Sequence, residues 1–143
     1  MARQGTALVP TRVQIDNFPT YAEQAGAKFP AYAAHMRALH ARADATLRAA
    51  HEAGVAIYCG TDAGGVLPHG LVAREVLALH AQVGLSAEAA LAGASWAARD
   101  WLGRPGLTPG ESADLVVYDA DPRADLGVLA RPRAVVLRGR VVA

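Results

Sequence analysis

The sequence has little of what would place it among secreted or membrane proteins. Its 143 residues include a single cysteine, Cys59, so no disulfide can form within the chain. No charged segment followed by an apolar one opens the chain, and no apolar run approaches the roughly 20 residues that span a bilayer. These absences predict a protein of the reducing cytoplasm that does not enter a membrane.

An excess of charge is absent as well. Lys and Arg total 14 against 13 Asp and Glu, and the net charge of +1 gives no broad field that would recruit nucleic acid or anionic lipid. Four arginines lie near the C-terminus, but no aromatic residues alternate with them for base stacking, and charges along a strand edge also prevent edge pairing. We therefore expect neither a nucleic-acid partner nor a membrane partner.

What the chain does contain is typical of a globular protein, with 52% hydrophobic and 19% charged residues. Its apolar pattern divides it into two regions. Residues 1–104 combine short apolar runs with helical stripes, which indicates an α/β unit. Residues 105–143 begin with prolines and glycines and lose the helical period, which indicates a small β segment.

Two apolar runs in the first region predict strands. Residues 5–11 (GTALVPT) are short and end at a proline, and residues 55–59 (VAIYC) show no polar alternation, as expected for a strand covered on both faces of a parallel sheet. Between them, residues 12–30 contain two prolines and a glycine and predict a loop with at most a short helix. Residues 31–53 predict a long amphipathic helix.

Beyond residue 59 the signals are short-range. An apolar stripe from Val72 to Val83 predicts a helix, and Ser86 and Ser95 are suited to cap the next two helices. Three strands are then expected, with Arg138 and Gly139 as a tight turn between the last two, at residues 115–118, 134–137 and 140–142.

The stretch most informative about chemistry is residues 54–65, GVAIYCGTDAGG, which places Asp62 directly after a predicted buried strand. In α/β barrels, catalytic groups gather at the carboxyl ends of the strands, and glycines let a substrate or metal approach the backbone. From its position alone, Asp62 could equally form an Asx turn or cap the next segment. Both interpretations stay open at this point.

Several blocks, taken in order, resemble the C-terminal region of the amidohydrolase superfamily in its imidazolonepropionase-like and prolidase-like branch. A lone GTD is a weak signal, whereas GTD with the alanine-rich helices and PGESADLVV is a strong one, and residues 5–11 match more weakly. The blocks are GVAIYCGTDAGG (54–65), PHG (68–70) with Glu75, GLSAEAALAGASWAARDWLG (84–103), LTPGESADLVVYDADP (107–122) and VVLRGRVV (135–142).

The resemblance implies a fold and an activity. Residues 1–104 would be the last strands and helices of a (β/α)8 barrel, and residues 105–143 would belong to a small β-rich composite domain. The activity would be metal-dependent hydrolysis of C–N bonds in cyclic amides or proline dipeptides. Asp62 matches the aspartate that touches the metal-bound water, takes its proton as a general base and returns it as a general acid. His69 could contact the small-molecule substrate or pack within its loop.

Most of that site has no match here. The superfamily holds one or two divalent ions, zinc above all, with a His-x-His pair, a carboxylated Lys or a Glu, and two single histidines. No His-x-His occurs, and the single lysine, Lys28, falls in a predicted loop. Because such a barrel takes about 250 residues, we expect an inactive fragment. A module that docks onto a separately encoded N-terminal half is the alternative, and unpaired strands favour a homo-oligomer.

The other candidate side chains have structural interpretations. Cys59 has no histidine nearby in the sequence to activate it and is expected in the core. Glu75, in the first turns of a predicted helix, is favourable towards the helix dipole, with a role in the site left open. The remaining histidines show no ligand spacing and are expected at the surface or between helices: His35, His40, His51 and His80.

Overall fold

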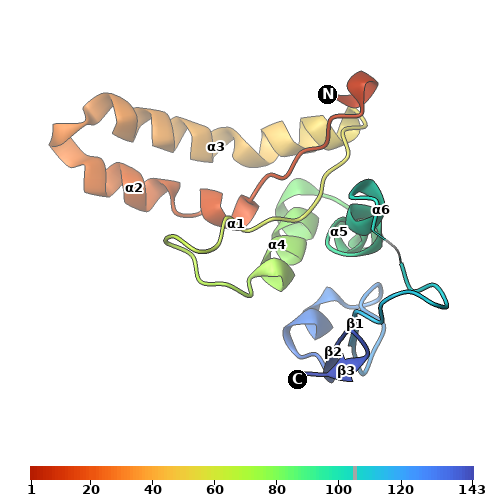
Figure 1. Ribbon diagram of the computed structural model, residues 1–143. Coiled ribbons are helices and arrows are strands. Elements are labelled where there is room, and N and C mark those ends of the chain that lie inside the picture. Colours follow the sequence, from red (N-terminus) through yellow and green to blue (C-terminus); the bar gives the residue numbers. More distant parts are fainter. Residues whose placement is uncertain (105) are drawn as a thin grey trace.

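The computed structural model describes residues 1–104 and 106–143. Figure 1 shows a long helical hairpin, a group of shorter helices beside it and a small sheet at the C-terminal end. The helical elements of the N-terminal half are η1 (Ala2–Gln4), α1 (Arg12–Ile15), α2 (Phe18–Ala25), η2 (Gly26–Lys28) and α3 (Pro30–Glu52).

The hairpin is formed by α2 and α3, which lie side by side and which we call the arm (Figure 1). Ala22, Ala33 and Met36 are buried between the two helices. The long helix was predicted almost to its ends, and Pro30 occupies its first turn, as its position suggested. Residues 12–29, predicted as a loop with a possible short helix, are mostly helical. Pro19 also lies in the first turn of a helix, where the missing amide hydrogen has no cost, so it does not interrupt α2.

The two segments predicted as strands run parallel to each other but meet in a single bridge, between Leu8 and Ile57. The Leu8 amide donates to the Ala56 carbonyl at 2.8 Å, and the Tyr58 amide donates to the Leu8 carbonyl at 2.9 Å. Ile57 is buried, whereas Ala56 beside it is exposed. Cover on both faces was expected and is not found, because the pair packs on helices through one face.

Four helical elements follow this pair, and they are α4 (Val72–Ala78), a π-helical turn η3 (Leu79–Val83), α5 (Ala87–Gly93) and α6 (Trp96–Trp101). Ser86 caps α5 as predicted, since its Oγ accepts from the Ala89 amide at 3.1 Å. Ser95 does not cap α6. Its hydroxyl instead donates to the Leu91 carbonyl at 2.6 Å, a bond back to its own preceding turn that competes with capping.

The main core joins these helices to the parallel pair. α5 approaches the pair closely at Gly93, where a Cβ atom would lie 2.8 Å from the Ile57 carbonyl oxygen, and the Gly93 carbonyl accepts from the Cys59 amide at 2.9 Å. The buried residues of this core come from both halves of the chain: Leu47, Ile57, Val76, Leu79, Val83, Leu85, Ala90, Leu126 and Leu129.

The C-terminal region is a three-stranded antiparallel sheet in the order β1-β2-β3. Its elements are β1 (Leu115–Val117), η4 (Leu126–Ala130), β2 (Ala134–Leu137) and β3 (Arg140–Val141). The predicted strands and the turn at Arg138 and Gly139 are confirmed. Leu126 and Leu129 of η4 pack in the main core, which ties the sheet to the helices. The fold is therefore a mixed α and β structure. Within the described ranges, none of the helices has the length and apolar character needed to cross a membrane.

Candidate functional site

Asp62 lies in the loop that follows the Leu8–Ile57 bridge, and its side chain is exposed. Its backbone φ is 52°, in the left-handed region that aspartate adopts more readily than most residues. Across residues 1–104 and 106–143, no hydrogen bond or ion pair engages its carboxylate. The Asx turn that was the structural alternative therefore lacks its defining bond, and the carboxylate stays open to a ligand.

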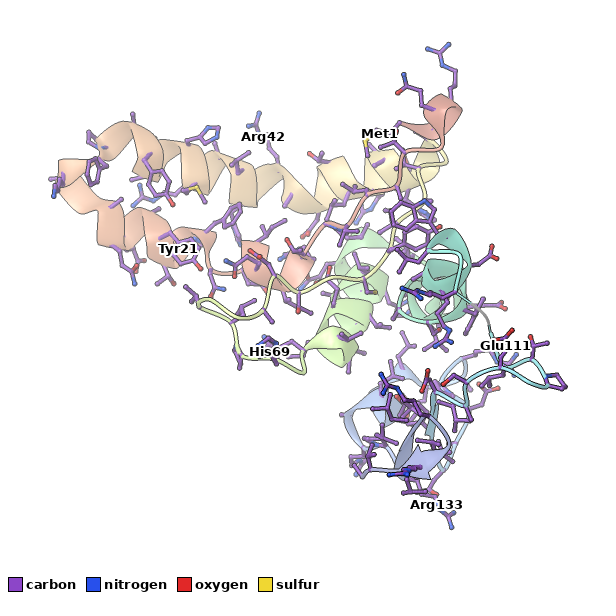
Figure 2. The ribbon with its side chains drawn as sticks, viewed as in Figure 1. Met1, Tyr21, Arg42, His69, Glu111 and Arg133 are labelled. Carbon is purple, nitrogen blue, oxygen red and sulfur yellow. The ribbon has the colours of Figure 1, made fainter. Side chains whose placement is uncertain are left out.

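His69 belongs to the same loop and is also exposed (Figure 2). Its ring lies over Gly64, where a Cβ atom would come within 3.6 Å of the ring Cε1 and 3.7 Å of Nε2. A backbone hydrogen bond also closes a turn within this loop, since the Gly64 amide donates to the Leu67 carbonyl at 3.0 Å. Packing within the loop accounts for the ring position, and its exposed edge leaves a substrate contact open.

Thr11 reaches the same end of the parallel pair and was not singled out from the sequence. Its φ is 50°, which is uncommon for a β-branched residue. Its Cγ2 lies 3.7 Å from where a Cβ atom on Gly60 would be, and that atom would clash with Val9 Cγ1. Any side chain at position 60 would therefore require the Val9 side chain to move. The sequence signal that could have identified Thr11 is the parallel order of the two segments. It places Pro10-Thr11 and Gly60-Thr61-Asp62 at the same end of the pair.

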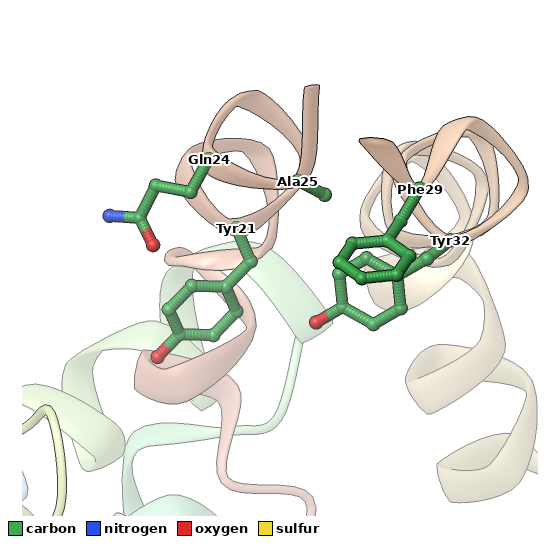
Figure 3. Close-up of a pocket in the computed structure, with 5 residues that line it drawn as sticks. All are labelled: Tyr21, Gln24, Ala25, Phe29 and Tyr32. Carbon is green, nitrogen blue, oxygen red and sulfur yellow. The ribbon is translucent and has the colours of Figure 1, made fainter. Parts of the chain in front are cut away.

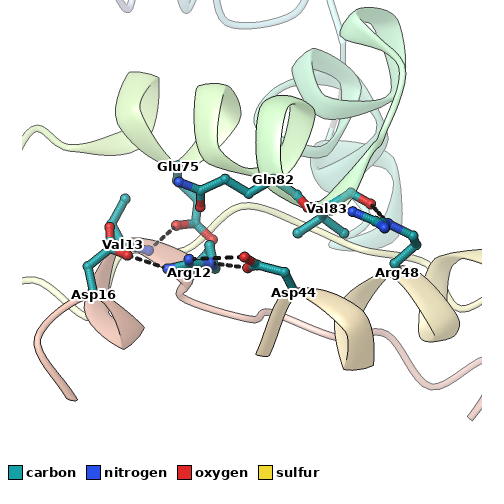
Figure 4. A network of polar contacts seen from close by, with 8 residues as sticks. All are labelled: Arg12, Val13, Asp16, Asp44, Arg48, Glu75, Gln82 and Val83. Atoms are coloured by element: carbon teal, nitrogen blue, oxygen red, sulfur yellow. Dashed lines mark hydrogen bonds and ion pairs between the residues drawn. The ribbon is translucent and has the colours of Figure 1, made fainter. Parts of the chain in front are cut away.

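Glu75 is completely buried, and it holds the start of a different helix from its own (Figure 4). Its Oε1 accepts from the Arg12 amide at 2.8 Å, and its Oε2 accepts from the Val13 amide at 2.8 Å. The sequence suggested a favourable interaction of Glu75 with the dipole of its own helix, α4. Its hydrogen-bond partners are instead the first two amides of α1. Burial raises the pKa of the Glu75 carboxyl, although the two amide bonds act in the opposite direction.

The side chain of Arg12 completes this network with two carboxylates. Its Nε lies 2.5 Å from Asp44 Oδ1 on α3, and its Nη1 lies 2.5 Å from Oδ1 of Asp16, the residue that follows α1. Arg12 is only 4% exposed, so both pairs are partly withdrawn from solvent. The buried charge of the arginine is therefore compensated, and α1, α3 and α4 are joined at one point.

Cys59 is not a nucleophile in this arrangement. Burial raises the pKa of its thiol to about 12, and the nearby charge of Glu75 adds to the shift. The sulfur lies 3.7 Å from the Ala90 carbonyl oxygen. His80 is likewise structural, with Nδ1 2.7 Å from the Leu85 carbonyl oxygen. Both residues fit the packing roles expected from the sequence.

Two hollows on the surface lie elsewhere. The larger, of about 430 Å³, is near the turn of the arm (Figure 3) and is lined by Tyr21, Gln24, Ala25, Phe29 and Tyr32. The smaller, of about 280 Å³, lies between α1 and α4. Neither of these two hollows includes Asp62 or His69, both of which are exposed.

Comparison with known proteins decides the lineage. A model of the amidohydrolase family matches residues 1–142. The chain belongs to the amidohydrolase family. Uncharacterized proteins of Mycobacterium tuberculosis and Mycobacterium bovis are each 54% identical to it over 140 residues. These matches cover 98% of this chain and 37% of each mycobacterial protein, so the chain spans little more than a third of their length.

Solved structures of other amidohydrolases agree with this assignment. A Xaa-Pro dipeptidase with methionine bound in its active site aligns over 99% of this chain and 35% of its own, with 27% identity and a TM-score of 0.82. A putative prolidase from Bifidobacterium longum aligns over 78% of this chain and 28% of its own, with 34% identity and a TM-score of 0.69. The resemblance inferred from the sequence blocks is confirmed.

Members of the amidohydrolase family generally use divalent metals, but this chain does not fit one by itself. Within residues 1–104 and 106–143, no three His, Cys, Asp or Glu side chains gather where they could hold an ion. A catalytic zinc takes about three protein ligands with an open position for water. Asp62 is therefore at most one ligand of a larger set.

Proposed function

We propose that this chain is the C-terminal part of a metal-dependent hydrolase that acts on C–N bonds, with cyclic amides or proline dipeptides as substrates. The observation that carries the proposal is the exposed, unpartnered carboxylate of Asp62 at the end of the parallel pair. Family membership and the likeness to a Xaa-Pro dipeptidase over 99% of the chain support it.

The parallel pair suggests where the chain belongs in such an enzyme. We propose that residues 1–104 form the last strands and helices of a (β/α)8 barrel and that residues 105–143 form part of a small β-rich domain beside it. The exposed side of the pair, at Ala56, then faces the interior of the completed barrel. The remaining strands of the barrel would correspond to the part of the mycobacterial relatives that this chain does not match.

A divalent metal, with zinc as our proposal, would polarise the substrate carbonyl and lower the pKa of water in the completed site. Its other ligands would come from the rest of the barrel. The role of this chain is then proton transfer. The Asp62 carboxylate accepts a proton from the attacking water and returns it to the leaving nitrogen, acting as general base and then as general acid.

We assign His69 a second role, in contact with the substrate. Its ring is fixed over Gly64 and exposed at its other edge, in the same loop as Asp62. A histidine in that place can hydrogen-bond a carboxylate or carbonyl of a bound dipeptide without taking part in proton transfer. Replacing His69 with alanine should then raise KM more than it lowers kcat.

As an alternative, we propose a complementing module that docks onto a separately encoded N-terminal half and supplies Asp62 to it. The unpaired backbone edges of the parallel pair, which meets in a single bridge, would support such docking. Mixing the purified chain with the N-terminal part of a relative distinguishes the two cases. Activity that appears on mixing supports the module, and activity only after covalent fusion supports a single enzyme.

The test of Asp62 uses a chimera in which this chain replaces the matching part of the mycobacterial relative. Asp62→Asn keeps the shape of the side chain and its tolerance of a positive φ, but it removes the basic oxygen. Turnover of Xaa-Pro dipeptides or cyclic amides should fall by about 10² to 10⁴. Metal content should stay the same because the other ligands would hold the ion, and the melting temperature should stay the same because the Asp62 side chain is exposed.

The matched control is Asp119→Asn, a change of the same kind at an exposed aspartate of the C-terminal region that pairs with Arg133. It should leave turnover unchanged. Turnover close to that of the parent in Asp62→Asn, with unchanged metal content, would refute the catalytic assignment.

A further inference from the structure

The loop of Asp62 is connected to Glu75 through a short series of contacts. Glu75 is fully buried, and its two oxygens accept the amides of Arg12 and Val13 at 2.8 Å each (Figure 4). These amides are the first two of α1, and the residue before them is Thr11, with φ 50° and ψ 50°. The carboxylate of Glu75 therefore determines where the Thr11 turn is placed.

The Thr11 turn in turn lies against the start of the Asp62 loop. A Cβ atom built on Gly60 would lie 3.7 Å from Thr11 Cγ2 and would clash with Cγ1 of the Val9 side chain, so the two segments pack side by side there. Asp62 is two residues further on and also has a positive φ, of 52°. Thr11 thus lies beside Gly60 at the start of the Asp62 loop, so a shift of the Thr11 turn would change the packing around Gly60.

We infer that Glu75 is a positioning residue for Asp62: its carboxylate holds the Thr11 turn against Gly60 and so fixes the direction of the Asp62 side chain. The inference rests on the proposed role of Asp62 as the proton-transferring group. Glu75 does not touch the substrate. It acts from α4, through two backbone bonds that its carboxylate accepts with one oxygen each.

The variant that tests this is Glu75→Gln in the chimera. Glutamine has the same length, but its amide nitrogen cannot accept, so one of the two bonds from Arg12 and Val13 is lost. Asp16→Asn is the matched control, because it removes a carboxylate from the same network without touching either amide. We expect Glu75→Gln to lower kcat by about 10 to 10² with little change in KM, and Asp16→Asn to leave both unchanged.

A double variant separates positioning from general stability. If Glu75 acts through Asp62, Asp62→Asn with Glu75→Gln should have the same kcat as Asp62→Asn alone, because the misplaced group is already inactive. Independent losses that multiply would overturn the inference. Near-parental turnover in Asp62→Asn would instead refute the proposed function, so the two failures are distinct.

Hydrogen exchange gives a readout that needs no turnover. In Glu75→Gln, amides of the peptide covering residues 60–64 should exchange faster, together with those of residues 11–13, and Asp16→Asn should leave the 60–64 peptide unchanged. Faster exchange confined to residues 11–13 would show that Glu75 only caps α1 and would overturn the inference, even in a chimera without activity.

Discussion

Arg48 of α3 donates from Nε to the Val83 carbonyl oxygen at 3.1 Å (Figure 4). Its Nη2 donates to the Gln82 carbonyl at 2.9 Å, so one guanidinium binds two carbonyls at the end of the π-helical turn η3. Because the helix ends here, no following turn supplies amide donors to these two carbonyls. A positive charge beside them is favourable towards the helix dipole. The long helix of the arm is thereby joined to the helices that follow the Asp62 loop.

Removing this contact should destabilise the chain modestly. We expect Arg48→Ala to lower the free energy of unfolding by about 1 kcal/mol, a value reduced by the exposure of the side chain. Arg42→Ala is the matched control, since Arg42 is exposed on the same helix and, among residues 1–104 and 106–143, bonds only to the Ala38 carbonyl of its own helix. Urea denaturation at low protein concentration measures both, and equal midpoints for the two variants would contradict the prediction.

The buried carboxyl of Glu75 predicts a pH dependence of stability. Because burial raises the pKa of Glu75 in the folded state, the folded chain binds the proton more tightly than the unfolded one. The stability linked to this group is fully present below the unfolded pKa and is lost as pH rises through the raised folded value. The difference in unfolding free energy between the parent and Glu75→Gln should therefore shrink with rising pH across that window. A difference that grows with pH would show that the pKa is lowered instead.

Metal retention is predicted to need the rest of the barrel. The described residues gather no three ligating side chains, so the isolated chain should bind no zinc tightly, whereas the chimera should. Equilibrium dialysis followed by metal analysis measures both. Retention of stoichiometric zinc by the isolated chain in the presence of a mild chelator would contradict the prediction.

The isolated chain should also self-associate. Val116, Leu137 and Val141 of the small sheet are 46%, 52% and 73% exposed, and the parallel pair leaves an uncovered backbone edge. Sedimentation velocity over a range of concentrations should show oligomers or loss of material. The chimera, with these surfaces covered, is the comparison, and a monodisperse, cooperatively melting monomer of the isolated chain would contradict this expectation.

The elements that the sequence predicted well are those whose signals are local. The turn at Arg138 and Gly139 and the Ser86 cap depend on residues next to one another, and both are found. The helical content of residues 12–29 was underestimated because a proline at the start of a helix, such as Pro19, and one in a loop look alike in sequence. The capping of α1 by Glu75 could not be predicted, since the carboxylate and its two amides are 62 and 63 residues apart and belong to different helices.

The arm has a consequence for the order in which the chain folds. α2 and α3 are consecutive in sequence, so their packing needs only a short loop closure. The Leu8–Ile57 bridge joins two residues that are separated in sequence by the whole arm, so its closure has a larger entropic cost while the arm is unfolded. We expect the arm to form early and the bridge late. The Asp62 loop follows the bridge directly, so Asp62 is expected to be among the last residues to reach its place.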